Sequence, residues 1–391
     1  MNLLLLILAG VSFFIWIVLT FFRGAFWQLR AFDGDGAIDP APVRWPRVVA
    51  VTPARDEEET IERSVESLAG QDYSGELHIV VVDDHSEDKT GELGREAARR
   101  AGASERLTIL EAPALEVGWT GKLWALNQGI GAASRFAPDY FWFTDADIVH
   151  DPDTLRRLVA KAENRRLDLA SLMVLLQAKT IPERLLIPAF LYFFLMLYPP
   201  RWVADPKAKT AGAAGGCILL RREALERIGG IVAIRAEVID DCALARAVKR
   251  GGGKIWMGLT RKSVSLRAYT RFGEIRDLIA RTAFTQLRYS WWMLLGTLAG
   301  MVVTYAVPVA LTFAGRPLVW RLSLTGWALM TVTYLPTVRF YGLSALCAPL
   351  LPVAAVFYTY ATWLSGMRYA LGKGGLWKGR AQAPMRSGQE H

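Results

Sequence analysis

The feature that most restricts the fold of this chain is an uncharged apolar run of twenty residues near its start, residues 3–22. At about 1.5 Å of rise per residue, a helix of this length crosses the roughly 30 Å hydrocarbon core of a bilayer. A cleaved signal peptide would have a basic start and a small-residue cleavage site, and neither is found around this run. Because Arg23 and Arg30 follow it closely, the positive-inside rule places the next part of the chain in the cytoplasm. We therefore predict that residues 1–22 are an uncleaved transmembrane anchor.

Three further apolar stretches lie in the last quarter of the chain, at residues 291–314, 318–338 and 343–366. Hydrophobic residues make up 52% of the 391 residues, which exceeds the usual share in a soluble protein and agrees with several membrane spans. We predict a C-terminal transmembrane region of two or three spans over residues 291–366 and a basic tail over residues 367–391.

The orientation of the C-terminus stays open. Three spans that start in the cytoplasm would leave the tail outside, whereas its basic residues favour the inside. These residues are Arg368, Lys373, Lys378, Arg380 and Arg386. Either one stretch is re-entrant or interfacial, or the tail is an exception to the rule. A shorter apolar run at residues 185–198 contains a proline and is too short to span comfortably, so we expect an interfacial or core helix there.

Between the membrane segments the sequence pattern changes. Residues 23–46 are predicted to be a linker, because their second half is rich in Gly, Pro and Asp. Beyond them, strand-like and helix-like stretches alternate. Buried strands are expected at residues 48–51 and 77–82, further strands at residues 107–110 and 140–143, and helices at residues 57–69 and 90–101. This order predicts an α/β domain over residues 47–290, with a mostly parallel sheet covered by helices on both faces. Ligands of such sheets bind beyond the carboxyl ends of the strands.

The net charge and the cysteine content argue against several other classes of protein. The formal net charge of +9 is, in a chain with membrane spans, more typical of cytoplasmic loops and anionic lipid than of nucleic-acid binding. No basic stripe with interleaved aromatic residues stands out, so we expect no nucleic-acid partner. The three widely spaced cysteines form neither a disulfide framework nor a zinc motif.

Polar residues follow two consecutive predicted strands. The first strand leads into a segment with Pro53, Arg55 and Glu57, and the second ends in Asp83 and Asp84. Each group taken alone is explained equally well by a helix start, where carboxylates cap the helix or complement its dipole. Their repetition at successive strand ends favours a site that holds a ribose or a base.

A third strand end carries Asp145 and Asp147 directly after an aromatic run. Residues two apart in an extended chain point to the same side, so we expect both carboxylates to converge on one divalent cation. Hard oxygen ligands favour Mg²⁺ or Mn²⁺, with water and phosphate in the remaining positions. Two solvated aspartates in a turn are the alternative interpretation, which the preceding aromatic strand makes less attractive.

Two more segments complete the candidate site. A glycine-bounded loop presents Lys122 just before a predicted helix, which suits a phosphate or a base carbonyl. Its spacing is not that of a Walker loop, so we do not predict an ATPase. Asp240 and Asp241 open another helix, where they either cap it or supply a general base for an acceptor hydroxyl. Upstream, the small-residue run 212–217 would let the backbone approach a ligand closely or would serve tight packing.

In combination, these motifs resemble the family 2 inverting glycosyltransferases with the GT-A fold, over residues 47 to about 291. The matching segments are Pro53-Ala-Arg-Asp-Glu57, Val82-Asp-Asp84, Gly121-Lys122 with Ala125-Leu-Asn127, Thr144-Asp-Ala-Asp147 and Asp240-Asp241. Within that family the chain looks most like the hopene-associated glycosyltransferases of bacterial hopanoid clusters, and it also resembles ceramide and carotenoid glycosyltransferases. The resemblance implies a hexosyl- or N-acetylhexosaminyltransferase that moves a sugar, with inversion, from a nucleotide-sugar to a hopanoid or similar lipid. A UDP-sugar is the expected donor.

The resemblance also implies a role for each site residue. Nucleotide-sugar binding falls to Pro53, Arg55, Glu57, Asp83, Asp84, Lys122 and Asp145. Asp147, together with Asp145, would hold Mg²⁺ or Mn²⁺. Asp241 would be the catalytic base, although the family often has Glu-Asp at this place, so the choice between Asp240 and Asp241 stays open.

A last motif concerns the acceptor side. Many family members carry Gln-x-x-Arg-Trp on an interfacial helix. Here Gln286, Arg288 and Trp291 supply the residue types without that spacing. We therefore assign these three residues to the acceptor side and do not expect processive polymer synthesis.

Two alternative functions remain open beside the lipid glycosyltransferase. A polyprenyl-phosphate sugar transferase would share the fold and the motifs and differ only in its acceptor. A non-catalytic membrane scaffold that kept the fold would bind neither metal nor donor. For the enzyme, the expected location is the cell inner membrane, with several spans and a cytoplasmic catalytic domain.

Overall fold

The computed structural model describes residues 2–29, 32–33, 39–372, 376–377 and 380–381. The chain divides into two compact units. The helical unit consists of Met1–Arg30, Ala178–Arg201 and Tyr269–Gly374, and the sheet unit consists of Ala31–Gln177, Trp202–Ala268 and Gly375–His391. Most of the predicted basic tail lies outside the described residues, as does Arg30.

The sheet unit is built on a nine-stranded sheet with the order β1-β9-β7-β8-β5-β2-β3-β4, and β6 pairs with β9. The strands are β1 Phe32–Asp33, β2 Val48–Ala54, β3 Leu77–Asp83, β4 Leu107–Glu111, β5 Tyr140–Phe143, β6 Ile148–His150, β7 Leu169–Leu175, β8 Ile218–Arg221 and β9 Ile255–Ser265. Strands β5, β2, β3 and β4 are mutually parallel, as are β1, β9 and β7. Strand β8 runs antiparallel between β5 and β7, and β6 is antiparallel to β9. The predicted mostly parallel sheet is confirmed.

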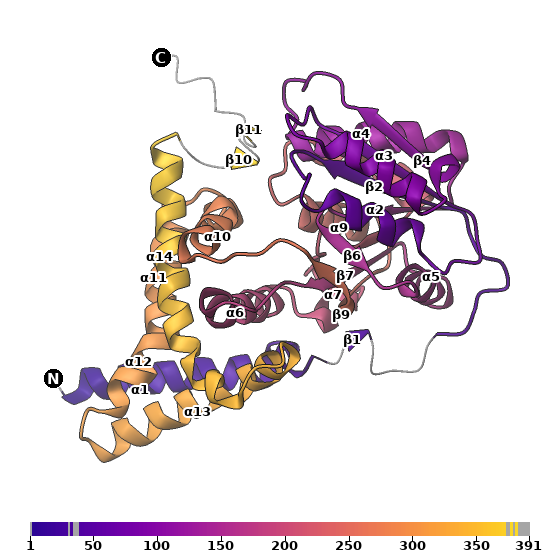
Figure 1. Ribbon diagram of the computed structural model, residues 1–391. Helices are drawn as coiled ribbons and strands as arrows, with labels where there is room; N and C mark the ends of the chain where they lie inside the picture. The colour runs from indigo at the N-terminus through magenta and orange to yellow at the C-terminus, as the bar shows by residue number, and fades with distance from the viewer. Residues whose placement is uncertain (1, 30–31, 34–38, 373–375, 378–379, 382–391) are drawn as a thin grey trace. The chain divides into compact units, whose positions relative to one another are not determined.

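Helices cover both faces of this sheet, as predicted (Figure 1). Successive residues of a strand point to opposite faces. On one face, Val48 and Ala50 of β2 belong to a buried cluster shared with α2 Ile61–Ala69, α3 Thr90–Arg100 and α5 Thr154–Arg165. On the other face, α4 Gly121–Ala133 packs on β2 and β3 so closely that a Cβ at Gly129 would collide with Val51 and Val82. The sheet unit also contains α8 Arg222–Arg227 and α9 Asp240–Arg250.

Helix α2 begins four residues later than its sequence pattern predicts. Residues 57–60 form a turn in which the Thr60 amide donates to the Glu57 carbonyl at 3.0 Å. The preceding Asp56 has a φ of +49°, a left-handed conformation that stops a helix from extending backwards. The segment is thereby held at the carboxyl end of β2 instead of continuing the helix.

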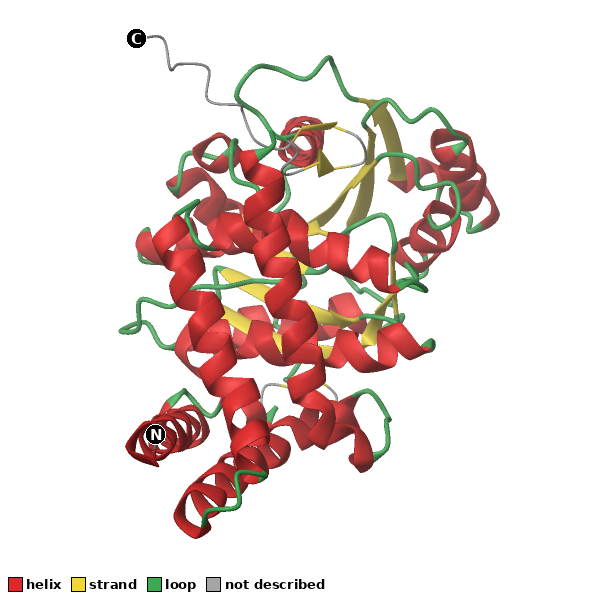
Figure 2. Cartoon of the chain, turned by 90° about the vertical axis from the view of Figure 1, so that its left-hand side faces the viewer, coloured by secondary structure: helices red, strands yellow, loops and turns green. Residues whose placement is uncertain are grey.

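The helical unit consists of helices joined by loops, among the residues described (Figure 2). They are α1 Asn2–Ile17 continued by η1 Val18–Phe22, α6 Ile181–Leu197, α10 Phe272–Gln286, α11 Trp291–Met301 continued by η6 Val302–Ala306 and α12 Val307–Thr312, α13 Pro317–Phe340, η7 Ala345–Leu350 and α14 Leu351–Ala370. Helix α1 packs on α12 and α13, and α14 packs on α10 and α11. The short helix α7 Pro200–Ala204 crosses the boundary between the units.

Four helices of the described chain are long and apolar enough to cross a membrane by length and composition: Leu3–Phe22, Ile181–Ala204, Trp291–Thr312 and Ala345–Ala370. The first, third and fourth agree with predicted spans. The second is longer than the predicted run at residues 185–198, because a capping box at Thr180 starts α6 at Ile181 and the short helix α7 follows it, and 56% of its window is buried, as in a core helix.

The predicted span at residues 318–338 is helical in the structure but does not qualify as a candidate span. It forms one 24-residue helix, α13, yet it is not among the four candidates. The reason is composition: the helix carries Arg321, Arg339 and several Ser and Thr residues. The C-terminal region therefore contains two candidate spans, within the predicted two or three.

Candidate active site

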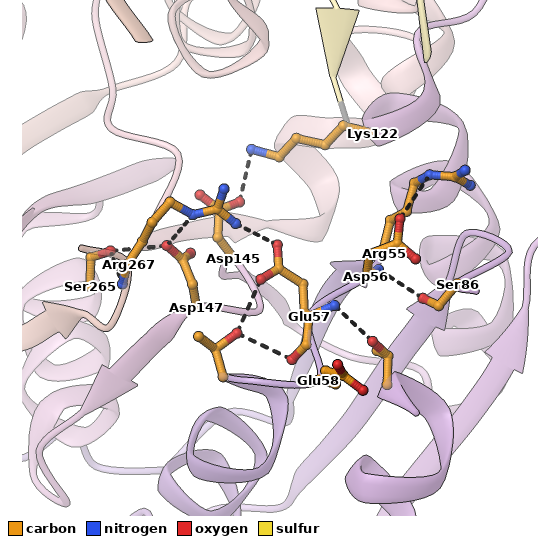
Figure 3. A network of polar contacts seen from close by, with 12 residues as sticks. Arg55, Asp56, Glu57, Glu58, Ser86, Lys122, Asp145, Asp147, Ser265 and Arg267 are labelled. Carbon is orange, nitrogen blue, oxygen red and sulfur yellow. Dashed lines mark hydrogen bonds and ion pairs between the residues drawn. The ribbon is translucent and has the colours of Figure 1, made fainter. Parts of the chain in front are cut away.

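The carboxyl ends of β2 and β3 lie side by side, because the two strands are parallel and pair in register up to Ala54 and Asp83. The loops that follow are tied together by hydrogen bonds (Figure 3). Arg55 donates from Nη1 to the carbonyls of Asp84 and His85, at 2.5 and 3.2 Å. The Asp56 amide donates to Ser86 Oγ at 3.0 Å. The two predicted nucleoside-binding segments therefore form one rigid rim.

The acidic residues on this rim differ in how far a ligand can reach their side chains. Asp83 is partly buried, and one of its oxygens accepts the Ser86 amide at 2.9 Å. Asp84 has no exposed surface, and its amide donates to the Ala54 carbonyl at 2.8 Å. Contact between Asp84 and a nucleoside would therefore require this loop to open, whereas Pro53 already lines a cavity described below.

Asp145 and Asp147 follow β5 but do not lie in an extended segment, which corrects the geometric argument made from sequence. The Ile148 amide donates to the Asp145 carbonyl at 3.2 Å, which closes a turn before β6. Thr144, just before the turn, is held by contacts of its hydroxyl with His150 Nε2 at 2.9 Å and the Gly216 carbonyl at 3.1 Å. His150 stays neutral near physiological pH because burial lowers its pKa to about 3.

The turn directs the two aspartates to different cations (Figure 3). Asp145 pairs with Lys122 at 2.8 Å. Asp147 Oδ2 accepts the Ser265 hydroxyl at 2.9 Å and lies 3.4 Å from Nε of Arg267. The groups are still close enough that burial and the Asp145 charge together raise the pKa of Asp147.

The carboxylates on this turn fit a Mg²⁺ or Mn²⁺ ion that is completed by its substrate. Among the described residues, no group of three or more His, Cys, Asp or Glu side chains is arranged to hold a metal. Mg²⁺-type sites commonly use one or two carboxylates and take the remaining ligands from water and substrate phosphates. The orientation of Asp147 is fixed by Ser265, as is usual for ligating carboxylates.

Lys122 connects the aspartate turn to the acidic start of α9. Its Nζ lies 2.8 Å from Asp145 Oδ1 and 3.3 Å from Asp240 Oδ2. Burial alone would favour the neutral amine, but the Asp145 and Asp240 charges outweigh it and raise the pKa of Lys122. The ammonium group is therefore a fixed positive charge between two predicted functional segments that are far apart in sequence.

Asp241 has a different environment from its neighbour. Its Oδ2 accepts the Gly215 amide at 2.9 Å, and its Oδ1 accepts the Cys242 amide at 2.6 Å. Burial and the adjacent Asp240 charge raise the pKa of Asp241 to about 6. A carboxylate with a pKa near 6 is better matched to proton abstraction at neutral pH than an ordinary aspartate. Asp240 is instead engaged by Lys122.

A small cavity joins these groups. Its polar lining comes from Lys122, Asp145, Gly215, Asp240 and Asp241, with Pro53 and a set of apolar side chains. The apolar set is Leu123, Leu126, Phe143, Ile218, Ile231, Ile234 and Leu244. Its volume of about 20 Å³ leaves room for little more than one water molecule, so a sugar must displace side chains to enter.

Two residues of this network were missed from sequence: Ser265, which ends β9, and Arg267, which follows it. Arg267 Nη2 donates to Glu57 Oε1 at 2.7 Å, in addition to its contact with Asp147. The rule applied to earlier strands, that functional groups follow strand ends, would have found both residues if β9 had been predicted.

The three acceptor-side residues belong to the helical unit. Gln286 ends α10 and shares hydrogen bonds of 2.7 and 3.0 Å with the Tyr198 hydroxyl. Arg288 is exposed, with a φ of +52°, and Trp291 begins α11 with 44% of its surface exposed. Their assignment to an acceptor stays a prediction.

Comparison with known proteins identifies the sheet unit. Residues 49–229 match the family described as Glycosyl transferase family 2. The mannosyltransferase PcManGT from Pyrobaculum calidifontis, solved in complex with GDP-Man and Mn²⁺, is similar with a TM-score of 0.54 and 20% identity, over 91% of this chain and 98% of that chain. Glucosyl-3-phosphoglycerate synthase from Mycobacterium tuberculosis matches 61% of this chain and 79% of its own, with a TM-score of 0.38 and 21% identity. No curated protein matches by sequence. Residues 49–229 thus match a glycosyltransferase family 2 domain, the sheet unit has the GT-A fold, and the chain is a glycosyltransferase.

Proposed function

We propose that this glycosyltransferase moves a sugar from a nucleoside diphosphate sugar to a lipid acceptor at the membrane, with inversion at the anomeric carbon. The observation that carries the proposal is the single ammonium group of Lys122 between Asp145 and Asp240, beside Asp241. One cavity thereby combines a cation for the leaving diphosphate with a candidate base. The complex of PcManGT with GDP-Man and Mn²⁺ supports a nucleotide-sugar donor and a divalent metal.

The proposed reaction is a single displacement. Asp241 accepts the proton of the acceptor hydroxyl, and the hydroxyl oxygen forms a bond to the anomeric carbon. The bond between that carbon and the diphosphate oxygen breaks, and the nucleoside diphosphate leaves with the electron pair. A Mg²⁺ or Mn²⁺ ion held by Asp147 and Asp145 would neutralise charge on the leaving group. Lys122 supplies a second, permanent positive charge near the same place.

The donor's nucleoside half is assigned to the rim that follows β2 and β3. Asp83, Arg55 and Glu57 lie there within one hydrogen-bonded network, at the strand ends where such sheets bind ligands. Because Asp84 is completely buried, we assign it to the support of that rim. We also assign it to the nucleoside, which it would contact once the loop opens. The base and the sugar of the donor are left to experiment, with UDP as the first choice.

A lipid acceptor is supported by the four candidate spans and by the resemblance to glycosyltransferases of hopanoids and other lipids. With the anchor inserted as the positive-inside rule favours, the sheet unit lies in the cytoplasm of the cell, at the inner membrane. Gln286, Arg288 and Trp291 are the residues we assign to the acceptor side. A polyprenyl phosphate acceptor would use the same catalytic groups.

Substitution of the proposed base tests the mechanism. Asp241→Asn removes the proton acceptor with little change in shape, so we expect turnover of donor with a lipid extract to fall by about 10²–10⁴-fold. Asp72→Asn is the matched control, because Asp72 is exposed and pairs only loosely with Arg156 at 3.4 Å. Full turnover by the Asp241 variant would remove this residue from the mechanism. Mass analysis of the extracted product distinguishes a neutral lipid from a polyprenyl phosphate.

A further inference from the structure

Arg267 occupies a position that no sequence motif assigned. It lies two residues beyond the end of β9, and its guanidinium group bridges two carboxylates (Figure 3). Nη2 lies 2.7 Å from Glu57 Oε1, and Nε lies 3.4 Å from Asp147 Oδ2. These carboxylates come from segments ninety residues apart, one predicted to contact the nucleoside and the other predicted to hold the metal.

The bridge places a positive charge beside the proposed metal ligand, Asp147. Asp147 and Glu57 have side chains only 14% and 13% exposed, so their charges are weakly screened by water. The oxygen of Asp147 that faces Arg267 also accepts the Ser265 hydroxyl. A divalent cation that approaches Asp147 therefore meets a carboxylate that already has a guanidinium group beside it, shared with Glu57, and one hydrogen-bond donor on the same oxygen.

The second aspartate of the turn also lies beside a cation that it shares with another carboxylate. Asp145 is paired with Lys122, at 2.8 Å. The described residues contain no larger group of metal-ligating side chains that could compensate. Each carboxylate that the turn offers to a divalent ion is thus matched to a cation of the chain itself.

We propose that Arg267 is an internal counter-ion that competes with the divalent metal for Asp147, so that the metal binds weakly until a nucleoside diphosphate arrives with it. The inference rests on the proposed metal-dependent function. The diphosphate supplies oxygen ligands to the metal and negative charge to the cations of the site. Nucleotide and metal then strengthen each other's binding by the same factor, as linkage requires.

A purely structural role for Arg267 makes a different prediction. If the guanidinium group only holds the segment after β9 in place, its removal lowers the stability of the protein. The affinity of the protein for the metal then stays unchanged or becomes weaker. If it competes with the metal, its removal raises metal affinity in the absence of nucleotide. Metal affinity measured directly, without turnover, therefore separates the two roles.

The experiment measures Mn²⁺ binding to the full-length protein in detergent, from the electron paramagnetic resonance signal of free Mn²⁺. For Arg267→Gln without nucleotide, we expect Mn²⁺ to bind about tenfold tighter or more, since one nearby positive charge is lost. Arg267→Lys keeps the charge and should bind Mn²⁺ within about threefold of the unchanged protein. Lys262→Gln is the matched control: it removes a positive charge from β9 that pairs with Asp151 and Asp153 instead.

Two further measurements test whether the effect depends on Asp147 and on the nucleotide. Adding Asp147→Asn to Arg267→Gln should abolish the gain, because the competition is for that carboxylate. Adding UDP or GDP to the unchanged protein should tighten Mn²⁺ binding, and the gain from Arg267→Gln should then shrink. Arg267→Met, which keeps the length and packing of the side chain, serves if the Gln variant fails to fold.

The outcomes distinguish this inference from the function on which it rests. Equal or weaker Mn²⁺ binding in Arg267→Gln, or in Arg267→Met if it replaces the Gln variant, with Mn²⁺ binding by the nucleotide-loaded protein intact, overturns the competition alone. No Mn²⁺ binding by the unchanged protein, even with saturating UDP or GDP, overturns the metal-dependent function and the competition together. An equal gain in Lys262→Gln assigns the effect to overall charge and also refutes the role of Arg267.

Discussion

Replacing Lys122 by methionine removes the positive charge that the structure places among three aspartates. Lys122 pairs with Asp145 and Asp240, and it also lowers the pKa of Asp241, which burial and Asp240 raise. The substitution keeps most of the side-chain volume, so the cavity retains its apolar lining. Its main effect should be electrostatic: Asp241 loses the cation that favours its ionised form.

The size of this effect follows from the geometry. The Nζ of Lys122 and the Oδ2 of Asp241 each lie within 3.5 Å of the position that a Cβ of Gly215 would take, so they are no more than about 7 Å apart. At that distance, with an effective dielectric constant of about 20 to 40, a pair of unit charges is worth roughly 1–2.4 kcal/mol. At about 1.4 kcal/mol per pKa unit, this raises the pKa of Asp241 by about one to two units.

The sign of the pH effect is clear. As the proposed base, Asp241 would act only when it is deprotonated, so kcat/KM of the unchanged enzyme should rise as the pH passes through about 6. In Lys122→Met the midpoint of this rise should move to about pH 7–8. The maximum rate should also fall, by about 100-fold or more, because a charge partner of the leaving diphosphate is lost.

The assay is the pH profile of kcat/KM for donor consumption with a lipid acceptor, from pH 5 to 9. Lys262→Met is the control, since Lys262 pairs with Asp153 at 2.9 Å and not with the proposed catalytic residues. Its profile should match that of the unchanged enzyme. An unchanged midpoint in Lys122→Met, or a shift to lower pH, would refute the electrostatic link between Lys122 and Asp241.

Two predictions concern stability. Gly129→Ala should lower the free energy of unfolding by about 1–3 kcal/mol, measured by thermal denaturation, because its Cβ would collide with Val51 and Val82; a variant as stable as the unchanged protein contradicts this close packing. Glu183→Ala should cost about 1–3 kcal/mol, because the buried carboxylate accepts the amides of Lys179, Thr180 and Tyr269 at 2.8–2.9 Å. Glu183→Gln, which keeps one acceptor oxygen, should lose less, and equal losses in the two variants would argue against the hydrogen bonds as the cause.

The sequence predicted the elements whose signals are local. The runs that became β2, β3, β4 and β5 are short and mostly apolar, and their alternation with helices indicated a largely parallel sheet with ligands at one edge. The helix Leu3–Phe22 was equally clear as a candidate span, because length and the absence of charge define one. Lys122, Asp145, Asp240 and Asp241 could be proposed as site residues because polar residues at the ends of elements are visible in the sequence itself.

Several properties of the site depended on contacts between distant segments. The burial of Asp84 results from the pairing of β2 with β3 and from the loop bonds around it. The separation of Asp145 from Asp147 depends on the turn that joins β5 to β6, which in turn pairs with β9. The start of α6 at Ile181 depends on a capping box that hydropathy does not detect.

The amino-acid sequence by itself determined the fold class, a first candidate membrane span and the identity of most charged groups of the candidate site, because hydrophobic periodicity and strand-end chemistry act over a few residues. Only the tertiary structure decided which charge faces which. Arg267 is about 120 residues from Asp147 and 210 residues from Glu57, and only the folding of β9 beside β7 and β6 carries it to them. Electrostatic pairing depends on distance in space and on exclusion of water, and neither can be read from the order of residues along the chain.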